Sequence, residues 1–190
     1  MGLKLNLGCG GKLLRGYVNV DIAPGVDVQW DLESFPWPWE NDSVSEIRLS
    51  HVLEHLGANP AVFIGVMKEI YRVCESDAKV FVAVPHPRHD NFIGDPTHVR
   101  PVTPATLEMF SKKLNLLWQR LRASNTPLAL RHDVDFEITS VNYTLDEPYS
   151  SDFKTGKLSS NDLIDLLKKY NNVASEIRMQ LKVIKDPATP

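Results

Sequence analysis

The chain has 190 residues, of which 43 % are hydrophobic and 24 % are charged, and its formal net charge is −3. This length predicts one domain over residues 1–190, with a composition ordinary for a soluble globular protein. The slightly acidic balance does not favour nucleic acid or an anionic membrane as a partner, and no apolar run approaches the roughly 20 residues of a membrane span. There is no secretory signal pattern, so we expect Cys9 and Cys74 to be free thiols in a cytoplasmic protein.

Short apolar segments in the first half of the chain predict the strands of a sheet. They lie at residues 3–7, 17–22, 26–30, 46–50 and 79–84. The last segment is almost wholly apolar, which is typical of a strand that is buried on both faces of a parallel sheet. Between the last two segments, residues 60–74 place apolar side chains at spacings of three and four, which predicts an amphipathic helix.

The second half of the chain predicts further helices and two late strands. Thr103 and Pro104 resemble a helix cap followed by a first-turn proline, and one apolar stripe continues from there to residue 121. Another helix is expected at residues 160–170. Residues 135–145 and 176–184 predict strands, because apolar and polar residues alternate in the second of them. This order of elements favours an α/β fold with a mostly parallel sheet and an antiparallel edge.

Glycines follow the first predicted strand directly, in the run Gly8-Cys9-Gly10-Gly11. Glycine allows a tight turn and lets a ligand approach the backbone closely, and the ligands of open parallel sheets sit beyond the carboxyl ends of the strands. Asp21 ends the second predicted strand, where a carboxylate can accept hydrogen bonds from both hydroxyls of a ribose. The alternatives are a plain strand-ending turn and a solvated acid.

A nicotinamide dinucleotide fits this turn poorly. The run is not Gly-x-Gly-x-x-Gly, because Leu13 occupies the place of the third glycine. Asp21 also follows the turn sooner than the roughly 20 residues that a dinucleotide fold expects. The short crossover leaves no helix N-terminus well placed for a pyrophosphate.

Several motifs in chain order resemble the class I S-adenosylmethionine-dependent methyltransferases, and most of all the small bacterial enzymes of type 11 with a similarly short first crossover. The resemblance covers roughly the first 100 residues, and the ordered motifs are more specific than the glycines alone. It implies a doubly wound, Rossmann-like sheet of seven strands, mostly parallel, with an antiparallel last strand. The motifs are LNLGCGGKLLRGYVNVDI at residues 5–22, Asp31-Leu32, Phe35-Pro36-Trp37, SHVLEH at residues 50–55, EIYRV at residues 69–73 and VPH at residues 84–86.

The resemblance also implies S-adenosylmethionine as the cofactor and assigns eight residues to it. The methionine end would contact the glycine-rich turn, and the ribose would contact the acid that ends the second strand. The adenine would contact the acid after the third strand and the amide that follows it, and the end of the fourth strand would line the methyl side. In that order the residues are Gly8, Cys9 and Gly10, then Asp21, then Asp31 and Leu32, then Ser50 and His51. A turn-forming aspartate and a hydroxyl bonded to backbone are the alternatives for Asp31 and Ser50.

The run from His51 to His55 matches H-x-x-E-H, which is a zinc-peptidase pattern. That zinc site needs both histidines in one helix and a third ligand. Here a predicted strand ends at the first histidine, and Gly57 and Pro60 follow shortly after. We therefore assign no metal ligand from the sequence and expect Glu54 and His55 to be structural.

Candidates for acid–base chemistry gather in the long irregular segment after the fifth predicted strand. Methyl transfer from a sulfonium is an in-line displacement that depends mainly on alignment, and a base is needed only when the acceptor must lose a proton. The catalytic candidates are His86, Asp95 and His98, together with His51 beside the methyl group. The alternatives are a polar loop whose side chains cap turns and a divalent ion held by Asp90, Asp95 and His98.

The leading hypothesis is a methyltransferase that acts on a small-molecule acceptor. The alternatives are a catalytically silent module that binds S-adenosylmethionine as a scaffold or regulator, and a nucleotide-dependent oxidoreductase. No basic strip with interleaved aromatic residues suggests nucleic acid. Since almost nothing precedes the first strand, we expect a lid from residues 85–104, from residues 145–160 or from a partner subunit, for instance in a homo-oligomer.

Overall fold

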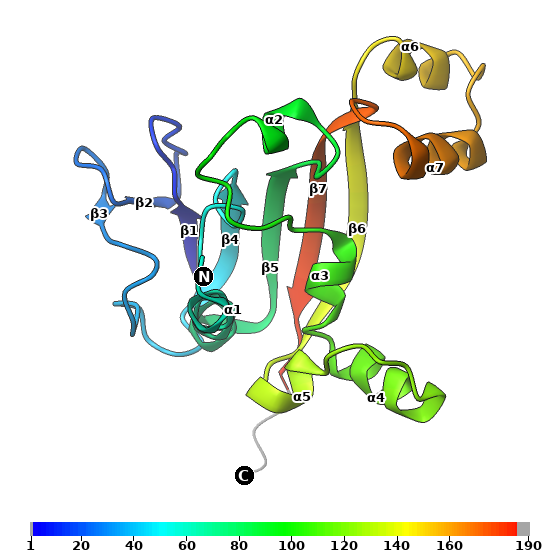
Figure 1. Cartoon of the computed structure of the whole chain (residues 1–190). Helices are drawn as coiled ribbons and strands as arrows, with labels where there is room; N and C mark the ends of the chain where they lie inside the picture. The colour runs from blue at the N-terminus through cyan, green and yellow to red at the C-terminus, as the bar shows by residue number, and fades with distance from the viewer. Residues whose placement is uncertain (1, 186–190) are drawn as a thin grey trace.

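The computed structural model describes residues 2–185, in which seven strands form one sheet in the order β3-β2-β1-β4-β5-β7-β6 (Figure 1). The first five strands pair in parallel, and β7 runs antiparallel to both β5 and β6. This confirms the mostly parallel, Rossmann-like sheet with an antiparallel last strand, and the strand order reverses between β1 and β4 as in a doubly wound sheet. The strands are β1 (Leu3–Leu7), β2 (Val18–Asp21), β3 (Val28–Gln29), β4 (Val44–Ser50), β5 (Cys74–Pro85), β6 (Phe136–Leu145) and β7 (Ala174–Val183).

The antiparallel strand does not lie at the edge of the sheet, so the expectation of an antiparallel edge is wrong. β7 is inserted between β5 and β6, and β6 forms the edge. Buried Ile177, Met179 and Leu181 alternate along β7 with the more exposed Arg178 and Gln180. The alternation in the sequence therefore reports a sheet with one buried and one solvated face, and it does not report an edge position.

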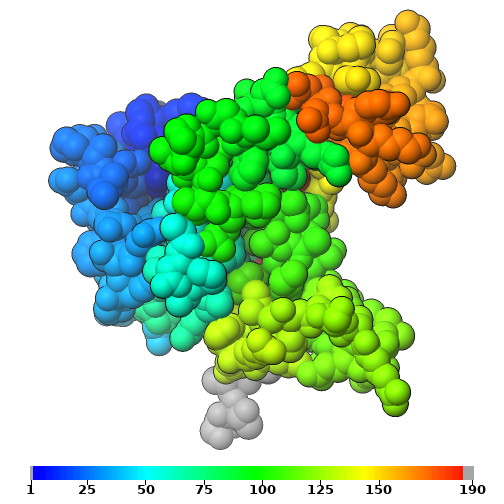
Figure 2. Space-filling model, in the orientation of Figure 1, coloured from blue at the N-terminus to red at the C-terminus, as the bar shows by residue number. Residues whose placement is uncertain are grey.

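Seven helices connect the strands in the described part of the chain. α1 and α7 lie where the sequence predicted helices, whereas the three short helices α2, α5 and α6 were not predicted. Figure 2 shows the segment of α6 and α7 standing out from the body of the molecule. Among residues 2–185, no helix combines the length and the apolar character needed to cross a bilayer. The helices are α1 (Pro60–Val73), α2 (Asp90–Ile93), α3 (Pro104–Glu108), α4 (Lys112–Leu121), α5 (Leu128–His132), α6 (Tyr149–Lys154) and α7 (Ser160–Lys169).

The single long helix expected after Thr103 is wrong, because the chain breaks into α3 and α4 at Ser111. The Ser111 hydroxyl accepts a hydrogen bond from the Leu114 amide (3.4 Å) and thereby caps a new helix. The break redirects the apolar stripe. Leu107 in α3 is buried, whereas Leu121 at the end of α4 is 67 % exposed.

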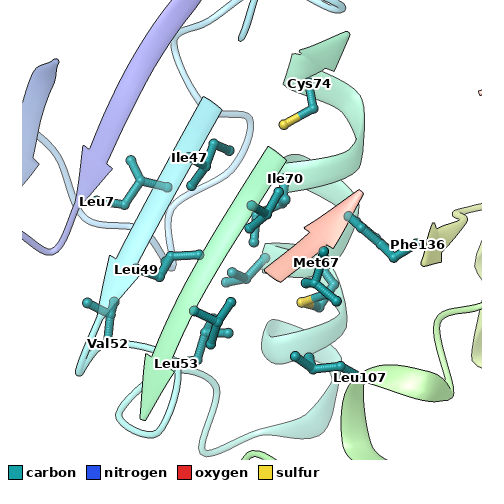
Figure 3. Packing of buried hydrophobic residues seen from close by; sticks show 14 of the residues in the cluster. Leu7, Ile47, Leu49, Val52, Leu53, Met67, Ile70, Cys74, Leu107 and Phe136 are labelled. Carbon is teal, nitrogen blue, oxygen red and sulfur yellow. The ribbon is translucent and has the colours of Figure 1, made fainter. Parts of the chain in front are cut away.

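One face of the sheet carries the hydrophobic core. Side chains alternate along a strand, so every second residue of β1, β4, β5 and β7 points to the same side. These residues pack against α1 and α3, which lie in front of the sheet in Figure 1. Figure 3 shows this packing for Leu7, Ile47 and Leu49 of the sheet, Val52 and Leu53 after β4, Met67 and Ile70 of α1, and Cys74, Leu107 and Phe136 around them.

The opposite face of the sheet, here called the outer face, carries polar side chains. Arg48 Nε donates a hydrogen bond to Tyr17 Oη (2.8 Å) and lies 3.1 Å from Glu46 Oε1. Lys4 Nζ lies 3.3 Å from the other oxygen of Glu46. Within residues 2–185, the crossovers between β1 and β4 contain no helix. The core helices therefore cover one face, and the outer face is a charged and partly solvated surface.

Candidate functional site

The carboxyl ends of β1 and β4 meet where the strand order reverses, and open α/β sheets bind their ligands at this point. Gly8 and Gly10 form the turn after β1 with φ of 63° and 49°, in the left-handed region that favours glycine. A Cβ on Gly8 would lie 2.5 Å from Val52 Cγ2, whereas a Cβ on Gly10 would meet nothing within 4 Å. Packing therefore requires Gly8, and Gly10 presents its backbone to open space.

Asp21 ends β2 and braces this turn. Its Oδ2 accepts a hydrogen bond from the Gly10 amide (2.7 Å), and its Oδ1 accepts one from the Ala23 amide (2.9 Å). Each carboxylate oxygen has further lone pairs, and the side chain is partly exposed. The structure thus places the expected ribose ligand against the expected glycine turn, and it gives Asp21 a bracing role that sequence reasoning did not assign.

The remaining residues that the resemblance assigns to the cofactor follow the same strand ends. Asp31 is exposed, and its Oδ1 accepts a hydrogen bond from the Glu33 amide (2.9 Å), as a turn-forming aspartate does. Leu32 has its side chain in the core. Cys9 is buried within the glycine turn, and Ser50 ends β4 with its side chain exposed. Their assignment to the cofactor stays a prediction.

His51 follows β4 directly and is held between two carboxylates. Its Nδ1 lies 3.5 Å from Glu54 Oε1, and its Nε2 lies 2.9 Å from Glu176 Oε2. Glu54 in the first place, and Glu176 after it, raise the pKa of His51 against the opposing effect of burial. His51 therefore keeps its proton to a higher pH than a free histidine.

Glu176 and Arg178 belong to this edge and were missed in the sequence. Because β7 is antiparallel, its first residues lie at the carboxyl ends of its parallel neighbours. Burial raises the pKa of Glu176, but hydrogen bonds from Arg178 and His51 outweigh it and lower the pKa overall. Thr144 also donates to this carboxylate (3.2 Å). The alternation along β7 predicted which face of the sheet each side chain occupies. It could not predict that Glu176 contacts His51, which lies 125 positions earlier in the chain.

The pKa of His51 provides a test of this geometry. The substitution Glu176→Gln removes one of the two carboxylates, so the pKa of His51 should fall toward its ordinary value of about 6.5. Since the folded pKa is raised, the stabilisation by protonated His51 is complete below the unfolded pKa and is lost as the pH rises through the folded value. In the variant this loss should come at lower pH. NMR titration of the His51 ring protons measures the shift, and an unchanged titration curve would contradict the contact.

A groove of about 460 Å³ opens on the outer face next to this edge. Its volume lies in the range of small-molecule sites, which is roughly 300–1,000 Å³. The strands β4, β5 and β7 form its floor, and the crossover after β1 reaches one side of it. The lining residues are Asn6, Lys12, Leu14, Arg48, Leu49, Ser50, Phe81, Val82, Ala83, Ser140, Asn142, Glu176, Arg178, Met179 and Gln180.

A larger hollow of about 600 Å³ lies at the opposite end of the sheet, near Asp42 before β4 and Lys185 after β7. Its prominent cation, Arg72, already donates to the Glu69 carboxylate (2.7 Å) and to the Trp39 carbonyl (2.9 Å). The reversal point of the strand order lies at the other end. We therefore base the candidate site on the smaller groove.

The structure separates the acid–base candidates that the sequence placed after β5. His86 is buried, its ring meets Tyr143 edge to face at 6.1 Å, and burial lowers its pKa. His98 Nε2 instead lies 3.7 Å from Asp95 Oδ2. The side-chain hydrogen bond from Thr97 lowers the pKa of Asp95. His51 contacts Glu176 in the groove lining, and the catalytic roles of all four candidates stay predictions.

Both segments expected to supply a lid carry a short helix, α2 and α6. The first is held by hydrogen bonds at two places. The Asp90 amide donates to Asn172 Oδ1 (2.9 Å), and the Val99 amide donates to the Glu54 carbonyl (2.8 Å). The segment after β5 is therefore tied to the start of β7 and to the corner after β4.

No protein-family model and no curated protein matches the sequence. The fold is nevertheless that of the class I S-adenosylmethionine-dependent methyltransferases, as solved structures show. A SAM-dependent methyltransferase from Archaeoglobus fulgidus is similar with a TM-score of 0.61 and 18 % identity, over 95 % of this chain and 86 % of that chain. An S-adenosylmethionine-dependent methyltransferase from Mesorhizobium loti is similar with a TM-score of 0.50 and 14 % identity, over 95 % and 90 %.

A similar fold also occurs in a protein that is named as a cyclase. The [4+2]-cyclase SpnF is similar to this chain with a TM-score of 0.56 and 13 % identity, over 97 % of this chain and 76 % of that chain. At such identities the likeness shows the fold, and function has to be argued from the site.

Proposed function

We propose that the protein is a methyltransferase that uses S-adenosylmethionine and acts on a small-molecule acceptor. The observation that carries the proposal is the pair of Gly10 and Asp21, an open glycine backbone hydrogen-bonded to a strand-end carboxylate at the reversal point of the sheet. The sequence motifs and the likeness of fold support the same cofactor. The free, buried thiols of Cys9 and Cys74 fit a cytoplasmic location.

The residues present fit the cofactor. Gly10 leaves room for a ligand against its backbone, and Asp21 keeps lone pairs for two hydroxyl donors beside its backbone bonds. The proposed contacts are those of the sequence motifs: Gly8, Cys9 and Gly10 for the methionine end, Asp21 for the ribose, Asp31 and Leu32 for the adenine, and Ser50 and His51 on the methyl side.

The acceptor enters through the groove on the outer face in this proposal. When bound, S-adenosylmethionine supplies a methyl group that the sulfonium already activates, so the protein mainly has to align the acceptor. Arg178 and Glu176 offer opposite charges in the groove next to Ser50. His51 lies between Glu54 and Glu176, and its contact with Glu176 (2.9 Å) would orient that carboxylate in the groove.

Calorimetry with three ligands tests the cofactor. We expect micromolar binding of S-adenosylmethionine and S-adenosylhomocysteine and no binding of NAD, because the turn lacks a third glycine and a helix N-terminus for a pyrophosphate. Binding of NAD without any response to the sulfonium cofactor would refute the proposal and favour the oxidoreductase.

A silent binding module is the second candidate, because a [4+2]-cyclase has a similar fold and the fold alone does not establish methyl transfer. Mass spectrometry of the denatured protein shows whether cofactor co-purifies. A broad acceptor screen that follows S-adenosylhomocysteine release then separates the two functions. Release with at least one acceptor supports the enzyme, and tight cofactor binding without any release supports the silent module.

A further inference from the structure

Three possible metal ligands meet between the corner after β4 and the segment after β5. Glu54, His55 and His98 each offer one ligand atom, and these atoms lie within 4.8 Å of one another. The rings of His55 and His98 have their centroids 4.6 Å apart. None of the three residues is among the proposed cofactor contacts or the groove lining, although Glu54 lies 3.5 Å from His51.

Hydrogen bonds orient both histidines in the way that metal ligands require. His98 Nδ1 lies 2.8 Å from the Phe92 carbonyl oxygen, which can only accept, so His98 carries its proton on Nδ1. The Thr97 hydroxyl donates to Asp95 Oδ1 (2.6 Å) and therefore accepts from His55 Nδ1 (3.0 Å). With a proton on Nδ1, a neutral imidazole carries its lone pair on Nε2, as in histidines that ligate metals. His98 Nε2 lies 3.7 Å from Asp95 Oδ2.

The buried carboxylate of Glu54 is a second, independent observation that supports a bound cation. Its side chain is 0 % exposed, and neither oxygen has a hydrogen-bond partner within residues 2–185. His51 Nδ1, at 3.5 Å from Oε1, is the nearby cation, but it makes no hydrogen bond of acceptable geometry to Glu54. A buried carboxylate without a hydrogen bond is costly even beside a histidine, and a metal ion would satisfy it.

We propose that Glu54, His55 and His98 bind one divalent transition-metal ion. Two imidazole nitrogens and one carboxylate suit zinc or ferrous iron, whereas magnesium and calcium prefer oxygen ligands throughout. Binding would bring these atoms, which lie within 4.8 Å of one another, to about 2.0–2.2 Å from one ion. The ion would join two segments of the chain, since Glu54 and His55 follow β4 and His98 lies in the segment after β5. This set of ligands differs from the divalent-ion site of Asp90, Asp95 and His98 that the sequence suggested. In the structure, Asp90 Oδ2 accepts a hydrogen bond from Asn172 Nδ2 (2.9 Å).

Thermal unfolding with added metal tests the proposal without reference to methyl transfer. The full chain is freed of metal with a chelator and then titrated with Zn²⁺, with Co²⁺ and with Mg²⁺. We expect one equivalent of Zn²⁺ to bind and, in excess over its Kd, to raise Tm by about 5–10 °C, with no change from Mg²⁺. Bound Co²⁺ should give visible absorption bands of a low-coordinate nitrogen and oxygen site.

Matched variants assign the effect to these residues. His98→Gln and Glu54→Gln should abolish the Zn²⁺-dependent rise in Tm, whereas His132→Gln, in α5 and outside the cluster, should keep it. The Co²⁺ spectrum of the unmodified chain reports the site even where a variant does not fold. The proposal is overturned if the chain binds no Zn²⁺, if Mg²⁺ acts equally, or if a folded His98→Gln keeps the full rise.

Discussion

Replacing Asp21 with alanine is expected to lower the affinity for S-adenosylhomocysteine at least about tenfold. The variant loses two charge-assisted hydrogen bonds to the ribose hydroxyls, each worth roughly 1.5–3 kcal/mol, and about 1.4 kcal/mol is a factor of ten in affinity. The structure adds an effect on folding, because Asp21 also accepts from the Gly10 and Ala23 amides. We expect the free energy of unfolding to fall by about 1–3 kcal/mol. Calorimetry and denaturant unfolding measure the two effects separately.

Asp27→Ala is the matched control for Asp21→Ala. Asp27 accepts hydrogen bonds from the Asn19 amide and from Asn19 Nδ2, both at 2.8 Å, and so holds the same region of the sheet. These hydrogen bonds go to Asn19 and not to Gly8, Cys9 or Gly10, so the loss of Asp27 should lower Tm and leave ligand affinity near that of the unmodified chain. Wild-type affinity in a folded Asp21→Ala would show that the cofactor does not bind over β1 and β2.

Replacing Gly8 with alanine should destabilise the fold more than any other change in the turn. The left-handed conformation costs an alanine about 1–2 kcal/mol. The new Cβ would also lie 2.5 Å from Val52, which is buried and cannot easily move away. Overpacking of this kind adds about 1–3 kcal/mol. We therefore expect the free energy of unfolding to fall by about 2–5 kcal/mol, as measured by urea denaturation.

The variant Gly10→Ala measures the cost of the left-handed backbone conformation without the overpacking against Val52. Gly10 has a similar φ, but a Cβ there meets nothing within 4 Å. Its unfolding free energy should fall by only about 1–2 kcal/mol. Its affinity for S-adenosylhomocysteine should fall as well, because the added methyl group occupies the space where the ligand would approach. Equal stability of the two variants would mean that Val52 yields, and unchanged affinity of Gly10→Ala would move the ligand away from this turn.

The sequence predicted those parts of the fold and site that local patterns control. The strands up to β5 and helix α1 follow from apolar periodicity, and the turn at Gly8 was placed from its position directly after a strand. Asp21 was found for the same reason, since it ends the next strand. Apolar periodicity did not predict a helix boundary that depends on a single capping residue. Ser111 ends one helix and caps the next, although the apolar spacing continues across it.

Long-range pairing explains the remaining differences. Glu176 reaches His51 only because β7 is inserted between β5 and β6, and no local pattern reports that insertion. His98 meets Glu54 and His55 through the path of the segment after β5, so spacing along the chain could not group it with them. The sequence shows that these residues have ionisable side chains, but their contacts depend on the topology of the fold.

The two faces of the sheet also bear on how freely this sequence can diverge. Along β4, Ile47 and Leu49 are buried in the core, while Arg48 between them points to the outer face beside the Phe81 ring. A substitution at either apolar position leaves a cavity or a clash, whereas a change at Arg48 alters partly solvated contacts and costs the fold less. Related chains would then retain every second residue of these strands and vary the residues between, until little overall identity remains.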